Sequence, residues 1–233
     1  MKCNHCLRGE AENQSMNRDY LLSFLKQIGY VSTVTFSGGE PTLPSGLKAI
    51  RDFLDICSRY DVGVGNFYMV TNAKVWRPEL PKLISQLYNF CDDNEISLLD
   101  ISTDQFHEKI QLQRFAFKER MESELENYFG IQDIVSMRTE VFYNQLIYQG
   151  RAETHLSAGA CYVPEDLLIE DMDNTLNIRD GEIYVNCEGN VIQGCDWSYE
   201  SQRKERAIIC SVYDNVENML RKKFEIYNEE MAA

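Results

Sequence analysis

The sequence predicts an α/β fold built from parallel βα units. Strand and helix patterns alternate from residue 20 to residue 143 without a hairpin between them. Polar, glycine-bearing motifs follow the ends of the predicted strands. Right-handed crossovers would close such units into a barrel or leave them as an open, doubly wound sheet. In both architectures ligands bind where the strands end, so the pattern predicts a site at that edge of the sheet.

The predicted strands are short and rich in β-branched and aromatic residues, whereas the predicted helices carry apolar residues three and four positions apart. The strands cover 33–36, 64–70, 96–102 and 137–143. The helices cover 20–28, 47–57, 78–91 and 109–129. Gly29 and Gly130 directly follow two of these helices, in the position that a C-cap glycine takes.

A C-terminal extension is predicted after the α/β domain, which we place at residues 1–152. Within the extension, residues 153–233, the segment 181–195 has the alternation and the central glycine of a β-hairpin. A last helix is expected to begin at Asp214, with Glu217 as its capping partner. The sequence therefore predicts one α/β domain with a small β-hairpin and a helix appended.

The composition limits the function classes. A chain of 233 residues with 44% hydrophobic and 26% charged residues is ordinary for a soluble globular protein. The formal net charge of −14 argues against binding to nucleic acid or to membrane surfaces. No apolar run reaches the roughly 18 residues of a membrane helix, and no secretory signal is visible, so a cytoplasmic protein is expected.

Eight cysteines in such a chain favour metal or cluster binding over disulfide bonds. Cys57 and Cys91 lie inside helical patterns and are expected to be buried core residues. Cys3 and Cys6 form a CxxC pair, whose thiolates can hold one metal ion or one edge of an iron–sulfur cluster. The pair alone leaves four interpretations open: a metal site, a cluster, a redox disulfide and two unrelated cysteines.

A second motif follows the predicted strand 33–36. It reads Ser37-Gly38-Gly39-Glu40-Pro41. Glycines at the end of a strand let the backbone approach a ligand and expose its polar groups, and Glu40 brings a carboxylate to the same place. The sequence therefore predicts that this motif contributes to the site.

Together, Cys-Asn-His-Cys-Leu-Arg-Gly and Phe-Ser-Gly-Gly-Glu-Pro resemble the radical S-adenosylmethionine (radical SAM) superfamily. The resemblance implies a partial (β/α)6 TIM-like barrel, a [4Fe–4S] cluster and S-adenosylmethionine (SAM). It further implies reductive cleavage of SAM to a 5′-deoxyadenosyl radical, which abstracts hydrogen from a substrate. The reductant would be a protein such as flavodoxin or ferredoxin.

The family signature has three cysteines, CxxxCxxC, and this chain departs from it. Cys3 and Cys6 fill the second and third places, and the first would fall two residues before Met1. The strand that precedes the cysteine loop in the family is also missing. We expect a start codon placed too late, or a cloning truncation, to account for both.

The resemblance also implies roles for individual residues. Cys3 and Cys6 would be cluster ligands. The implied cofactor-binding residues are His5 near the adenine, Ser37, Gly38, Gly39 and Glu40 at the methionine amino group, Ser102 and Asp104 at the ribose or the carboxylate, and Arg151 at the carboxylate. A solvated turn arginine is the alternative for Arg151. Thr71-Asn72-Ala73 is expected to be structural, and no catalytic residue is assigned.

The extension carries four further cysteines. They are Cys161, Cys187, Cys195 and Cys210. The predicted hairpin resembles the SPASM or twitch extension of some radical SAM enzymes, which holds auxiliary [4Fe–4S] clusters, although the closing CxxC pair is absent. The four cysteines are candidate ligands of one auxiliary cluster, and a hairpin that has lost its cluster is the alternative. SPASM-type relatives often modify peptides, which suggests a peptide or protein substrate.

Two other functions remain open at this stage. The first is a degenerate barrel that binds SAM or a partner without redox chemistry. The second is a zinc-binding module, although a second CxxC at zinc-ribbon spacing is missing.

Overall fold

The structure is a computed structural model that divides into two compact units. It describes residues 6, 8–36, 39–103, 111–138, 169–172, 175–178, 183–195, 197–204 and 207–220, with the backbone alone for 169–172 and 175–178. Unit 1 comprises Met1–Val31, Ile56–Val62 and Asn144–Ala233. Unit 2 comprises Ser32–Asp55 and Gly63–Tyr143. The units are described one at a time below.

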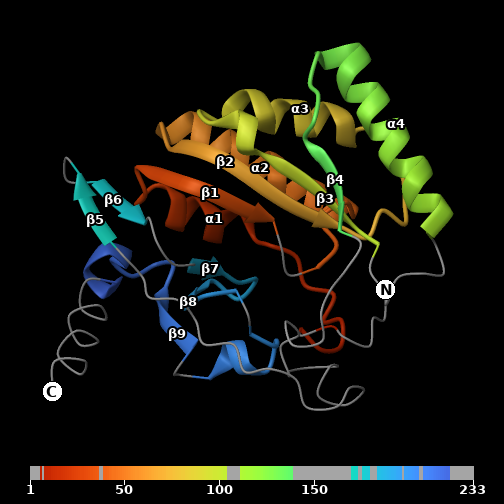
Figure 1. Cartoon of the computed structure of the whole chain (residues 1–233). Coiled ribbons are helices and arrows are strands. Elements are labelled where there is room, and N and C mark those ends of the chain that lie inside the picture. The colour runs from red at the N-terminus through yellow and green to blue at the C-terminus, as the bar shows by residue number, and fades with distance from the viewer. Residues whose placement is uncertain are drawn as a thin grey trace, which may run out of the picture. The chain divides into compact units, whose positions relative to one another are not determined.

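Unit 2 contains a parallel sheet, as the sequence predicts. Its strands are β1 (Tyr30–Phe36, from Ser32 on), β2 (Gly63–Thr71), β3 (Leu98–Ser102) and β4 (Val135–Arg138). They lie in the order β4-β3-β2-β1, and β2, β3 and β4 pair in parallel. The helices are α2 (Pro44–Tyr60, up to Asp55), α3 (Leu80–Phe90) and α4 (Gln111–Phe129), with a 3-10 turn, η1 (Asn94–Ile96), before β3 (Figure 1). The α/β class is therefore confirmed, whereas closure into a partial barrel stays a prediction.

The core of unit 2 lies between the strands and the helices α3 and α4. Alternate residues of β2 and β3, such as Phe67, Met69 and Leu99, are completely buried. The helices contribute an apolar stripe that contains Leu83, Ile84 and Leu87 of α3 and Met121 and Leu125 of α4. Because strand side chains alternate between two faces, this arrangement leaves the other residues of β2, β3 and β4 on a second face, where polar side chains lie among apolar ones such as Val70 and Leu98.

The two predicted glycine caps have opposite outcomes. Gly130 ends α4 with φ +69°, and the backbone N–H groups of Gly130 and Ile131 donate to carbonyls of the last turn. This prediction is confirmed. Gly29 does not cap the first helix, because α1 (Arg18–Leu25) ends four residues earlier. The backbone N–H groups of Gln27 and Ile28 donate to the carbonyls three residues earlier, as in a 3-10 helix, so the α-helix has already ended there.

Unit 1 contains two small pieces of sheet. The strand β6 (Thr175–Ile178) pairs in parallel with the first two residues of β1 and antiparallel with β5 (Ile169–Met172). A second sheet has the order β7 (Ile183–Val185), β8 (Asn190–Gln193), β9 (Ile208–Ser211), with a 3-10 turn, η4 (Ser201–Arg203), between the last two. Its strands are antiparallel. The predicted hairpin is confirmed, whereas the third strand was not predicted.

The predicted start of the last helix is wrong by one residue. The Asn215 side chain accepts a hydrogen bond from the backbone N–H of Asn218 at 3.0 Å and so caps the helical residues 216–220. Asp214 instead accepts from the N–H of Ser211 at 2.8 Å and closes the preceding turn. The predicted domain boundary at residue 152 lies outside the described residues and stays a prediction. Within the described part of the chain, every helix is too short or too polar to cross a membrane.

We predict that Gly46→Ala destabilises the protein by about 1–3 kcal/mol, the usual cost of an overpacked site. A methyl group on Gly46, in the first turn of α2, would lie 2.3 Å from the backbone oxygen of Pro41, so the backbone would have to move. Gly39→Ala is the matched control, because no atom lies within 4 Å of its added methyl group. Urea unfolding of both variants tests this, and equal midpoints would contradict it.

We also predict a loss of stability at alkaline pH that depends on Cys91. This thiol is buried, as expected from the sequence, and burial raises its pKa to about 11 against the opposing hydrogen bond of Ser97. The unfolded chain then ionises first, so the contribution is complete below about pH 9 and is lost as the pH rises toward 11. The measurement is the free energy of unfolding at pH 9 and at pH 11. Between these pH values it should fall less for Cys91→Ala than for the unchanged chain, and an equal fall in both proteins would exclude the effect.

Candidate functional site

Glu40 lies at the edge of the parallel sheet where its strands end. Its half-buried carboxylate accepts two hydrogen bonds from Thr42, one from the backbone N–H at 3.1 Å and one from the hydroxyl at 2.6 Å. It also accepts from the hydroxyl of Thr71 at 2.6 Å and from the backbone N–H of Asn72 at 2.9 Å. The carboxylate thus joins the loop after β1 to the end of β2, and the chain itself supplies these four donors.

A buried arginine fixes the same turn from the helix side. Arg114 of α4 is completely buried, and its Nε donates to the backbone oxygen of Asn72 at 2.9 Å. The Thr71 hydroxyl accepts from the N–H of Ala73 at 3.0 Å, and Ala73 has a positive φ of 49°. Thr71-Asn72-Ala73 therefore forms the structural turn that the sequence suggested.

A polar cluster occupies the second face of the sheet, and sequence reasoning did not find it. Asp100 of β3 is buried and accepts hydrogen bonds from the Tyr68 hydroxyl at 3.1 Å, the Ser136 hydroxyl at 2.7 Å and Nε of Arg138 at 3.1 Å. An Nη of Arg138 also donates to the Tyr68 oxygen. We call these four residues the polar face. The available signal was a carboxylate between Leu99 and Ile101, in the middle of a predicted strand.

Burial sets the protonation of Tyr68 within this cluster. It raises the pKa of the phenol, and the charge of Asp100 acts in the same direction while that of Arg138 opposes it. The phenol therefore stays neutral at physiological pH and donates its proton to Asp100. Ser102, a predicted SAM contact, is half-buried at the end of β3 and lies opposite Arg138 in the strand register.

The cysteine loop of unit 1 is held by the C-terminal part of the chain. Arg8 is buried, and its Nη1 donates to the backbone oxygen of Trp197 at 2.6 Å. Its guanidinium lies 4.8 Å from the ring centre of Tyr184, and its backbone oxygen accepts from the N–H of Tyr199 at 3.0 Å. Cys6, two residues before Arg8, is half-buried. Arg8, which follows the predicted cysteine pair closely in the sequence, is therefore anchored by residues that follow the whole α/β domain.

A second contact, which is an ion pair, joins the same N-terminal and C-terminal segments. Arg203 binds both carboxylate oxygens of Glu12, at 2.8 and 2.6 Å, and also binds Glu188 at 2.7 Å. This hydrogen bonding lowers the pKa of Glu12. Exposed pairs of this kind contribute little stability singly, but the bidentate geometry fixes the orientation of the two segments.

The cysteines of the extension are divided between surface and core. Cys187 and Cys195 are half-buried, Cys210 is buried in β9, and no disulfide joins these or the other described cysteines. Burial raises the pKa of the Cys187 thiol, and the charges of Glu188 and Glu12 add to this. Among the residues that the structure describes, no three histidine, cysteine or acidic side chains form a group able to hold a metal ion.

Several predicted site residues lie outside the described part of the chain. These are Cys3, His5, Ser37, Gly38, Asp104, Arg151 and Cys161. Of the described ones, the structure places Gly39, Glu40 and Ser102 in unit 2 and Cys6, Cys187, Cys195 and Cys210 in unit 1. The proposed roles of both sets therefore stay predictions.

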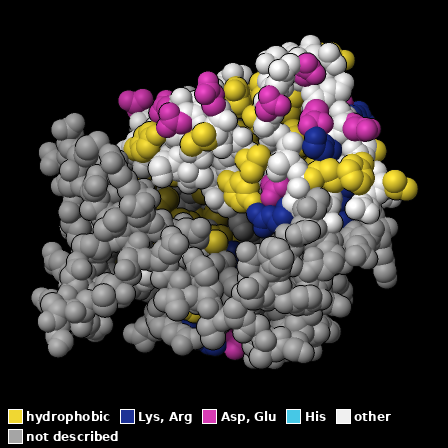
Figure 2. Space-filling model, viewed as in Figure 1, with side chains coloured by type: hydrophobic (Ala, Val, Ile, Leu, Met, Phe, Trp, Pro, Cys, Tyr) yellow, Lys and Arg dark blue, Asp and Glu magenta, His cyan; other side chains and the backbone are white. Residues whose placement is uncertain are grey.

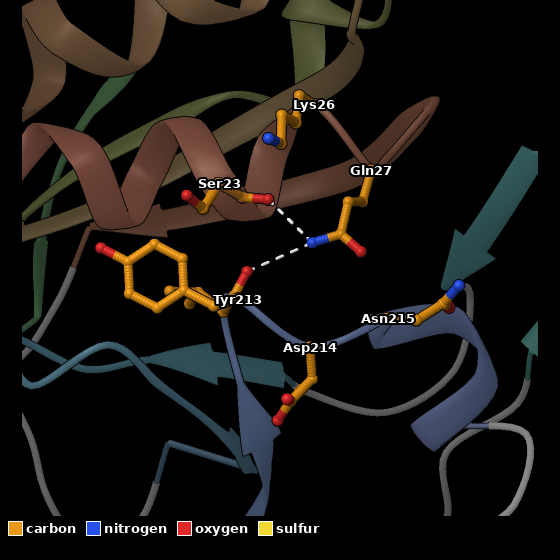
Figure 3. Close-up of a pocket in the computed structure, with 7 residues that line it drawn as sticks. Ser23, Lys26, Gln27, Tyr213, Asp214 and Asn215 are labelled. Carbon is orange, nitrogen blue, oxygen red and sulfur yellow. Dashed lines mark hydrogen bonds between the residues drawn. The ribbon is translucent and has the colours of Figure 1, made fainter.

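An open pocket of unit 1 lies between α1 and the turn before the last helix (Figure 3). Its volume is about 270 Å³. The amide of Gln27 donates to the backbone oxygens of Ser23 and Val212, at 2.8 and 3.2 Å. Asp214 and Asn215 also bind backbone N–H groups. Because these polar side chains serve the local backbone, we do not take this pocket as the functional site.

Comparison of the chain with protein-family models, with curated proteins and with solved structures found no match.

We predict that Thr71→Val destabilises the protein by about 1.5–3 kcal/mol, the typical value of a hydrogen bond to a charged group. The change keeps the side-chain shape, removes a donor from Glu40 and leaves the N–H of Ala73 without its acceptor. Thr35→Val, at an exposed position of β1, is the matched control. The measurement is urea unfolding, and a cost no larger than that of the control would show that Glu40 does not depend on Thr71.

Proposed function

We propose that this chain is a radical SAM protein whose α/β unit is a partial (β/α)6 barrel. In this proposal it acts on a peptide or protein side chain in the cytoplasm, where thiols stay reduced. The observation that supports it most is the position of Gly39 and Glu40, which lie where the parallel strands end and are tied there to Thr71 and Asn72. This is the edge at which α/β proteins bind their cofactors.

The cysteines agree with the cluster in ligand type but not in ligand number. Cys3 and Cys6 would hold it, because iron–sulfur clusters take thiolate ligands, and Cys6 is half-buried and outside any disulfide. The first cysteine of the family signature is not in this chain. When bound, such a cluster would supply the electron, taken from a flavodoxin or ferredoxin, for the reductive cleavage of SAM.

The remaining work falls to residues of this chain. Glu40 holds its loop through four hydrogen bonds, three to Oε1 and one to Oε2. Oε2 therefore keeps acceptor capacity for the predicted contact with the methionine amino group. The exposed backbone of Gly39 beside it would also contact the cofactor. The polar face of β2, β3 and β4 would orient the ligand. The barrel as a whole would exclude water from the reaction.

The surface of unit 2 agrees with a partner other than nucleic acid. Figure 2 shows acidic and hydrophobic side chains interspersed on the visible face, with few basic ones. This distribution fits the net charge of −14, which opposes the approach of a phosphate backbone.

Restoring the signature tests the proposal. A variant with a cysteine two residues before Met1 would complete CxxxCxxC with Cys3 and Cys6. After anaerobic loading with iron and sulfide, we expect this variant to bind iron and sulfide in equal amounts and, with a reductant and SAM, to release 5′-deoxyadenosine. The unchanged chain should bind less iron and release little 5′-deoxyadenosine. A variant with serine at the added position is the matched control.

Each other outcome identifies a competing function. Stoichiometric zinc without iron or sulfide in the extended variant would indicate a zinc-binding module. SAM binding without cluster formation would indicate a degenerate, non-catalytic barrel. Either result would overturn the catalytic proposal.

A further inference from the structure

Arg138 is the charged residue of the polar face that reaches solvent. Its side chain is 45% exposed, whereas that of its partner Asp100 is 6% exposed. Among the described residues, Asp100 and Tyr68 are its hydrogen-bond partners, through Nε and one Nη. The rest of the guanidinium fork carries further N–H donors, so a ligand on this face would meet a fixed set of them.

The cluster around Arg138 is rigid for a physical reason. A buried carboxylate is stable only when its oxygens are hydrogen-bonded, and Asp100 satisfies this need with Tyr68, Ser136 and Arg138 together. Three neighbouring strands supply these groups, so the guanidinium is oriented by the sheet rather than by a loop. Its orientation is therefore set before any ligand arrives, which lowers the entropic cost of binding.

The charge balance of the cluster selects the kind of ligand. Asp100 neutralises much of the charge of Arg138, and the phenol of Tyr68 adds none. One partly neutralised guanidinium suits a singly charged carboxylate, because the planar fork of N–H donors matches the two oxygens of a carboxylate. A doubly charged phosphate would face the nearby Asp100 with a single arginine to compensate.

We propose that Arg138, held in place by Asp100 and Tyr68, binds the carboxylate of a small ligand on the polar face. Asp100 is then a positioning residue that acts through Arg138. This inference deepens the proposed function, because it names the chemical group that the site recognises. The carboxylate belongs to a side chain of the substrate, and a binding experiment separates it from the amino-acid end of SAM.

The experiment uses the full chain without iron, so that failure of cluster formation cannot affect it. Two matched pairs of ligands are titrated and followed by ligand-observed NMR. The first pair is N-acetylglutamic acid amide and N-acetylglutamine amide, which differ in a side-chain carboxylate. The second is SAM and decarboxylated SAM. We expect N-acetylglutamic acid amide to bind at least about tenfold more tightly than N-acetylglutamine amide, as the loss of a charged hydrogen bond implies.

Arg138→Gln should remove that preference, whereas Arg51→Gln, the same change at an exposed arginine of α2, should keep it. Arg138→Lys keeps the charge without the fork and should lose part of the preference, which covers the case in which Arg138→Gln does not fold. Circular dichroism verifies folding. Equal binding within the first pair would overturn the proposal, and so would a preference in it that survives both Arg138 variants. A preference in the second pair alone that depends on Arg138 would assign this residue to SAM and would also overturn it.

Discussion

The carboxylate of Glu40 is the interaction on which the α/β unit depends. Burying a charge is costly unless hydrogen bonds replace its hydration, and here two threonine residues and a backbone N–H supply them. The requirement constrains its surroundings in turn. Thr71 has to carry a hydroxyl, and the close approach of Pro41 to the first turn of α2 leaves room for glycine alone at position 46. One charged group thus joins the loop after β1 to the end of β2.

A second constraint gives the two faces of the sheet different roles, one in the apolar core and one in binding a ligand. Residues of one strand alternate between two faces, so β2 and β3 can present Phe67 and Leu99 to the helices and Tyr68 and Asp100 to the opposite side. The first face is an ordinary apolar core. The second carries a satisfied polar network that ends in Arg138, a partly exposed cation. A rigid core on one side therefore supports a polar surface suited to a ligand on the other.

Unit 1 shows how distant segments can support one loop. Arg8 and Trp197 are separated by 189 positions in the sequence, yet they share a hydrogen bond, and Arg203 binds Glu12 across 191 positions. The cysteine loop is consequently not an independent motif. If it binds a cluster, the C-terminal sheet helps to hold the ligands in place, and changes in that sheet would alter the loop.

Local patterns carried the fold class and most element positions. The alternation of strands and helices, the cap at Gly130, the hairpin at 183–192 and the buried Cys57 and Cys91 all depend on residues a few positions apart. The hydrogen bonds that Glu40 accepts from Thr71 and Asn72 and the cluster at Asp100 depend on pairs 31 or more positions apart. The hydrophobic periodicity of the sequence does not reveal such pairs, because only the packing of the folded chain brings them together. The sequence could thus place a carboxylate at the end of a strand, and only the tertiary structure decided that this carboxylate holds the loop while Arg138 faces solvent.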